Sequence, residues 1–137
     1  MADRSAEESL AADSSLVVYA QGASRPEIYI IVDDHGITGF NGHVDLGTGI
    51  RTSLAQFVAE ELDAPFDRVR MILGSVAAGP DQGPPVASTT IQVTSLPLRK
   101  AAAPARRALV LLGAEMLDVE PDALTVKDGI LHETAGN

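Results

Sequence analysis

The chain has 137 residues, of which ten are basic and nineteen acidic, so its formal net charge at pH 7 is −9. Nucleic-acid binding depends on clustered Lys and Arg, so this charge argues against a nucleic-acid partner and disfavours an anionic membrane surface. Cysteine is absent, which excludes disulfides, thiolate-bound zinc and an iron–sulfur cluster held by cysteines of this chain.

The length suits one compact domain, and no apolar run approaches the roughly 18 residues of a membrane-spanning helix. We therefore expect no membrane insertion. No charged start is followed by an apolar run, as in a secretory signal, and the lack of disulfides agrees with a reducing compartment. These features together predict a cytoplasmic protein.

Residues 1–15 are small, polar and charged, which predicts a mobile N-terminal arm, with a short helix over residues 6–12 as the alternative. We expect residues 16–137 to form a single α+β domain. Val, Ile and Tyr are frequent in its first part, and turn residues separate the runs. The predicted strands cover residues 16–20, 27–32 and 37–46.

The clearest predicted helix covers residues 52–62. Leu54, Phe57, Val58 and Leu62 recur on one of its faces, as in a helix that packs on a core. A short strand over residues 69–73 and a loop rich in Gly and Pro should follow.

Residues 88–117 have helical character, but Pro97 and Pro104 interrupt the pattern, and a proline inside a helix costs about 3 kcal/mol. We therefore expect a break near Pro97, a kink or new start at Pro104, and a helix over residues 106–117. A hairpin should turn at Asp128-Gly129. The predicted architecture is α+β: a small, mainly antiparallel sheet with two main helices packed on one face.

The first candidate site is the segment Gly47-Thr48-Gly49, where a strand runs into a helix. Two glycines allow a ligand to approach the backbone closely, and free N–H groups at a helix start favour an anion. The alternative is a tight turn in which threonine caps the helix. The segment lacks the third glycine of a dinucleotide-binding fingerprint.

The second candidate site follows Asp81-Gln82-Gly83 and is rich in hydroxyl and amide groups, which suit a ligand that forms many hydrogen bonds. Its members are Ser88, Thr89, Thr90 and Gln92. The alternative is a set of capping residues that closes a proline-rich loop. The three histidines, His35, His43 and His132, show no metal-ligand spacing, and the sequence indicates neither a catalytic residue nor a metal ligand.

Four stretches, GHVDLGTGIRTSLAQFVAEELDAPFDRVRMI, PDQGPPVASTTIQ, LRKAAAPARRALVLL and VEPDALTVKDGILHE, carry a family resemblance. In order and spacing, this run resembles the molybdopterin-binding subunit of the xanthine dehydrogenase and aldehyde oxidase family. It is most similar to the bacterial branch with nicotinate dehydrogenase and isoquinoline oxidoreductase.

The resemblance implies a component of a molybdenum hydroxylase, which hydroxylates an N-heterocycle or an aldehyde with oxygen from water. It implies a molybdopterin cofactor, in some members carrying a cytosine dinucleotide, that this chain shares with a partner. By the resemblance, Gly47, Thr48 and Gly49 approach the metal end of the pterin. The second candidate segment then forms hydrogen bonds to the cofactor through Ser88, Thr89, Thr90 and Gln92. The expected partners are a larger molybdopterin-binding chain and an iron–sulfur subunit.

The chain departs from the family pattern at two site positions. Thr48 stands where the family usually has Gln, and Ala87 stands where it usually has Gly. The family's catalytic glutamate has no counterpart in these 137 residues. Two hypotheses follow: a small subunit or split fragment that forms part of the cofactor site, or a non-catalytic binding or assembly module, which could be a stand-alone homo-oligomer.

Overall fold

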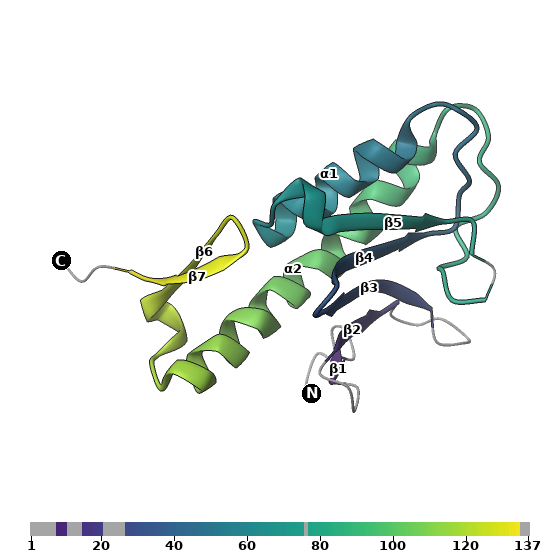
Figure 1. The fold of residues 1–137 in the computed structure, drawn as a ribbon. Helices are drawn as coiled ribbons and strands as arrows, with labels where there is room; N and C mark the ends of the chain where they lie inside the picture. Colours follow the sequence, from purple (N-terminus) through teal and green to yellow (C-terminus); the bar gives the residue numbers. More distant parts are fainter. Residues whose placement is uncertain (1–7, 11–14, 21–26, 76, 135–137) are drawn as a thin grey trace.

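The computed structural model describes residues 8–10, 15–20, 27–75 and 77–134. Five strands form one sheet in the order β1-β2-β3-β4-β5, in which the first four are antiparallel neighbours and β5 runs parallel to β4 (Figure 1). Their bounds are β1 Glu8–Leu10, β2 Leu16–Tyr19, β3 Ile28–Asp33, β4 Gly36–Asn41 and β5 Val69–Leu73.

Most of the predicted N-terminal arm, residues 1–7 and 11–14, lies outside the described residues, so its mobility stays a prediction. Within that stretch, Glu8–Leu10 pairs with β2 as an antiparallel edge strand. This strand and its pairing were not predicted, and the alternative of a helix is wrong at these three positions. Three residues carry too little pattern to predict a strand whose stability depends on the neighbour with which it pairs.

Two long helices, α1 (Ile50–Leu62) and α2 (Thr90–Leu117), pack against each other and cover one face of the sheet (Figure 1). Leu54, Val58 and Leu98 are fully buried between the helices and the strands. Phe57, the fourth member of the predicted apolar face, is only partly buried at the edge of this core. The predicted α+β architecture with both helices on one face is confirmed.

The predicted breaks at Pro97 and Pro104 are wrong, because α2 is one continuous helix of 28 residues with both prolines inside it. Each proline removes one backbone hydrogen bond, which is a local cost. Packing offsets that cost, since Thr94, Leu98 and Ala101 flank Pro97 and are all buried. Ala101, Ala102 and Ala105 are likewise buried on both sides of Pro104, so the burial around each proline outweighs its local cost.

Replacing Pro97 with alanine should raise the free energy of unfolding by about 2 kcal/mol. The change restores a helix hydrogen bond worth about 3 kcal/mol relative to proline, less about 1 kcal/mol for the greater freedom of the unfolded chain. Urea denaturation measures the difference, with Pro84→Ala in the loop before α2 as the control that should not gain stability. A loss of stability in Pro97→Ala would contradict the uninterrupted helix.

The C-terminal hairpin, β6 (Leu124–Lys127) and β7 (Ile130–Glu133), forms as predicted and lies apart from the main sheet (Figure 1). A short 3-10 turn, Pro121–Ala123, leads into the hairpin, and a second, Phe66–Arg68, precedes β5. The hairpin is tied to the helices at two points. The N–H of Gly129 donates to the carbonyl of Asp63 at the end of α1, and Gly113 of α2 leaves room for the Leu131 side chain.

The predicted strand over residues 37–46 is too long, because β4 ends at Asn41 and residues 42–49 form an irregular connection to α1. The cause is a close approach at Gly42. A Cβ there would lie 2.2 Å from the carbonyl oxygen of Pro80, so only glycine lets the two loops meet. This end of the sheet therefore gathers both candidate segments.

Candidate functional site

In the connection from β4 to α1, the backbone N–H groups of four residues donate hydrogen bonds to the carboxylate of Asp45. Its Oδ1 accepts hydrogen bonds from the N–H groups of Gly47 (2.9 Å), Thr48 (2.9 Å) and Gly49 (3.3 Å). Its Oδ2 accepts one from the N–H of Arg51 (3.2 Å) in the first turn of α1. Asp45 thus occupies the position of an anion at the start of the helix.

The backbone donors hold the pKa of the Asp45 carboxyl below its ordinary value of 3.8, with the N–H of Arg51 contributing most. The expectation that these N–H groups are free to meet an anionic ligand is therefore wrong for this structure, because a side chain of the same chain satisfies them. Sequence reasoning recognised the glycines but gave no role to the carboxylate that precedes them.

Asp45→Asn should weaken the acid dependence of stability. A lowered pKa in the folded state means that the unfolded chain binds the proton more readily, so the contribution of Asp45 is complete at neutral pH. That contribution disappears as the pH falls through the lowered pKa. Urea denaturation between pH 7 and pH 2 should give a flatter curve for Asp45→Asn than for the wild type. The exposed control Asp122→Asn should keep the wild-type slope, and equal slopes for both variants would contradict the role of Asp45.

The outer side of the corner is open. Gly47 and Gly49 have φ angles of 89° and 77°, in the left-handed region, and a Cβ on either would meet no atom of the described residues within 4 Å. Thr48 is exposed, and its hydroxyl lies 3.5 Å from Asp45. A ligand can therefore lie against the glycine backbone, although it cannot take the amides that Asp45 already holds.

The second segment leads into α2 through a strained turn. Ala87 and Ser88 are both exposed and have positive φ angles of 53° and 56°. A residue with a Cβ in this region costs about 1–2 kcal/mol, and such strain gathers at functional turns. The hydroxyl of Thr89 donates to the carbonyl of Val86 (2.7 Å), while Gln92 is exposed on the first turn of α2.

His43 joins the two segments and is only 1% exposed. Its Nδ1 lies 2.9 Å from the hydroxyl of Thr90, and its Nε2 lies 3.1 Å from the carbonyl oxygen of Gln82. The N–H of Gly42 donates to the side-chain oxygen of Gln82 at 2.8 Å. Both loops therefore lie at the end of the sheet where α1 and α2 begin (Figure 1).

Three residues of this junction, Asn41, His43 and Gln82, had no predicted structural role. Asn41 is fully buried, and its Oδ1 accepts the N–H of His43 at 3.0 Å, while its Nδ2 has no hydrogen-bond partner among the described residues. No linear pattern could reveal His43, because its partners are 47 and 39 residues away.

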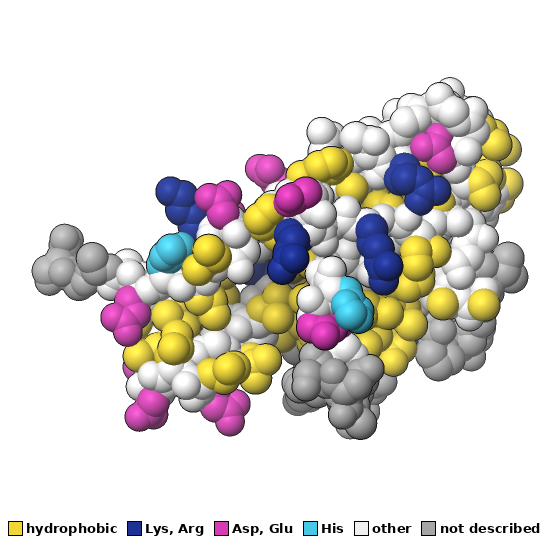
Figure 2. Space-filling model, in the orientation of Figure 1, with side chains coloured by type: hydrophobic (Ala, Val, Ile, Leu, Met, Phe, Trp, Pro, Cys, Tyr) yellow, Lys and Arg dark blue, Asp and Glu magenta, His cyan; other side chains and the backbone are white. Residues whose placement is uncertain are grey.

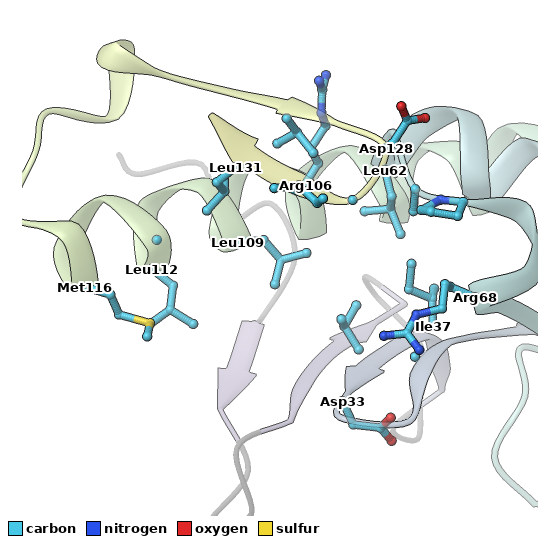
Figure 3. Close-up of a pocket in the computed structure, with 18 residues that line it drawn as sticks. Asp33, Ile37, Leu62, Arg68, Arg106, Leu109, Leu112, Met116, Asp128 and Leu131 are labelled. Atoms are coloured by element: carbon cyan, nitrogen blue, oxygen red, sulfur yellow. The ribbon is translucent and has the colours of Figure 1, made fainter. Parts of the chain in front are cut away.

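A hollow lies at the other end of the molecule from the two candidate segments, between the end of α1, the second half of α2 and the hairpin (Figure 3). It has a volume of about 560 Å³, and its lining includes Leu109, Leu112, Met116 and Leu131. Met116 is 78% exposed, and apolar side chains gather on the surface over this region (Figure 2). Arg68, Asp33 and Asp128 also border the hollow, so its walls are apolar with charged groups among them.

Among the described residues, no group of three His, Cys, Asp or Glu side chains is placed to hold a metal ion. Of the helices that the structure describes, none is both long and apolar enough to span a bilayer.

Comparison with known proteins defines the class of this domain. Residues 10–137 match the family described as "Molybdopterin cofactor-binding domain". The chain belongs to this family, whose members are domains of molybdenum hydroxylases.

Two curated relatives are long proteins of which this chain covers a small part. One subunit of the nicotinate dehydrogenase of Pseudomonas putida is 51% identical over 111 residues, which are 80% of this chain and 9% of the relative. The beta subunit of isoquinoline 1-oxidoreductase of Brevundimonas diminuta is 35% identical over 118 residues, or 80% of this chain and 15% of the relative.

The fold recurs in a crystal structure of quinoline 2-oxidoreductase from Pseudomonas putida 86. The TM-score is 0.62 at 22% identity, over 76% of this chain and 13% of that one.

Proposed function

We propose that this chain forms one wall of a molybdopterin site, and that a larger partner chain supplies the rest of the pocket and the catalytic base. The observation that carries the proposal is the junction at His43, which brings the open Gly47–Gly49 corner and the segment 88–92 to one end of the sheet. Two segments that face the same end can contact one ligand together.

The residues at this end fit the hydrogen-bonding parts of a pterin better than a phosphate at the start of α1. Gly47 and Gly49 leave their outer faces open, while Thr48 and Ser88 are exposed hydroxyl residues. The carboxylate of Asp45 repels a phosphate from the α1 amides. When bound, the molybdenum group would supply the redox chemistry, and the residues of this chain would bind and orient its organic part.

The proposed cofactor contacts are therefore those of Gly47, Thr48, Gly49, Ser88, Thr89 and Gln92. The buried Thr90 would support them by its contact with His43, which fixes the start of α2. The cofactor is molybdopterin, with its cytosine dinucleotide form as the alternative. The reaction of the complete complex would be oxidative hydroxylation of an N-heterocycle or an aldehyde, in the cytoplasm.

The hollow beside α2 supports a partner chain. Leu112, Met116 and Ile130 are exposed there, and exposed apolar surface is typical of protein interfaces. The proposed occupant is the larger molybdopterin-binding chain, whose apolar surface would cover these side chains. The iron–sulfur subunit would join the complex as a third chain.

Isolation of the tagged chain from its native cell tests the proposal. Mass spectrometry should find a larger chain and an iron–sulfur chain, and the same sample should contain molybdenum and a pterin. In the double variant Thr48→Val/Ser88→Ala, the pterin content should fall by a factor of about ten or more, because two hydrogen bonds to the cofactor are lost. The control Thr125→Val, on the exposed face of β6, should retain the wild-type amount. A complex without molybdenum would contradict the proposal.

A second candidate function is an assembly module that docks on a large subunit without contacting its cofactor. The specific observation in its favour is Asp45, which fills the position that an anionic group of the cofactor would take. Under this alternative the partner chain co-purifies, and the pterin content does not respond to Thr48→Val/Ser88→Ala.

A further inference from the structure

The buried imidazole of His43 has a hydrogen-bond partner at each of its two ring nitrogens. The carbonyl oxygen of Gln82 can only accept a hydrogen bond, so the Nε2 atom 3.1 Å away must carry a proton. In the neutral ring, Nδ1 is then the acceptor for the hydroxyl of Thr90, at 2.9 Å. Nε2 therefore bonds to Gln82 in the loop before α2, and Nδ1 bonds to Thr90, the first residue of α2.

The backbone of His43 is held as firmly as its ring. The N–H of His43 donates to Oδ1 of Asn41, the last residue of β4, at 3.0 Å. The neighbouring Gly42 contacts the loop at Pro80 and donates to the side chain of Gln82. The ring is thus anchored to the sheet on one side and to the α2 loop on the other.

Thr90 transmits this anchoring to the second segment. It is the first residue of α2, is buried, and directly follows Ser88 and Thr89. Its carbonyl accepts the hydroxyl of the buried Thr94 at 2.9 Å, so the first turn of the helix is held on two sides. A shift at Thr90 must therefore move the hydroxyl residues that precede it.

We propose that His43 is a positioning residue that sets, through Thr90 and Gln82, the place of segment 88–90 relative to the Gly47–Gly49 corner. His43 contacts no ligand in this role. The inference rests on the proposed function only in its claim that the two segments bind a pterin. The contact of His43 with both segments exists in the chain without a cofactor.

The first test reads the imidazole directly in the full chain. Nitrogen-15 spectra should show that the neutral ring of His43 carries its proton on Nε2, with the exposed His35 and His132 as references. Thr90→Val removes the hydroxyl and should shift the Nδ1 signal, together with the amide signals of Gly42 and Ser88. Thr90→Ser keeps the hydroxyl and should restore the wild-type positions, while Thr125→Val should change none of them.

The second test measures binding of isolated molybdopterin to the same proteins. Thr90→Val should weaken binding at least about fivefold, the effect expected from one lost buried hydrogen bond, and Thr90→Ser should stay within about twofold of the wild type.

A wild-type His43 with an unprotonated Nε2 would overturn the inference, whether or not Thr90→Val folds. So would a folded Thr90→Val whose Gly42 and Ser88 signals stay in place. If the wild-type chain and its complex bind no pterin while the Thr90 variants move these signals as expected, the proposed function fails and the positioning role stands.

Discussion

Gly42→Ala should lower the free energy of unfolding by about 3 kcal/mol and separate the two loops of the candidate site. The added Cβ would lie 2.2 Å from the Pro80 carbonyl oxygen, a backbone atom that cannot rotate away. Overpacking of this kind costs about 1–3 kcal/mol, and each hydrogen bond lost when the loop shifts adds about 1 kcal/mol. The bonds at risk are those of Gln82 with Gly42 and His43. Chemical denaturation measures the loss.

Gly47→Ala is the matched control, because its Cβ would meet nothing within 4 Å. Its φ of 89° still costs the alanine about 1–2 kcal/mol, so it should destabilise the chain less than Gly42→Ala. A stability of Gly42→Ala within about 0.5 kcal/mol of the wild type would show that the loops do not meet as described.

Leu54→Ala should cost about 3–5 kcal/mol, the second of the two large effects. Leu54 is fully buried where α1, α2 and the sheet meet, so its removal leaves a cavity that three elements cannot easily close. Thermal and urea denaturation both measure the change. Phe57→Ala should lower the free energy of unfolding less than the same substitution at a fully buried phenylalanine, because Phe57 is only partly buried.

The control for Leu54→Ala is Leu46→Ala, in the connection before α1, where the leucine is 74% exposed. An exposed leucine contributes little, so this change should stay within about 0.5 kcal/mol of the wild type. Equal effects at Leu46 and Leu54 would mean that α1 does not pack on the core through the face described.

Asp45 affects how the chain can take part in cofactor binding. A glycine-flanked helix start is ordinarily a ready site for an anion, yet here the chain provides its own carboxylate for that site. The open glycine faces and the nearby hydroxyls remain, which suits contact with an uncharged part of a ligand. The pterin content of Thr48→Val/Ser88→Ala therefore separates cofactor binding from docking alone.

Local patterns in the sequence determined most of the secondary structure and the fold class. The strands over 16–20, 27–32 and 69–73, the helix near 52–62 and the hairpin at Asp128-Gly129 all follow from the spacing of apolar residues and from turn residues. These signals act between neighbours in the chain, so they can be read without knowing the fold. The family resemblance rests on the same linear text, and the comparisons confirm it.

Only the tertiary structure decided the path of α2 and the chemistry of the two loops. Burial along α2 outweighs the local cost of Pro97 and Pro104, and that burial depends on the sheet and α1. The role of His43 could not be predicted from the sequence, because its partners Thr90 and Gln82 contact it only when β4 and the start of α2 are packed together. Asp45 likewise competes with an outside anion for the amides at the start of α1 only because the folded connection places its carboxylate next to them.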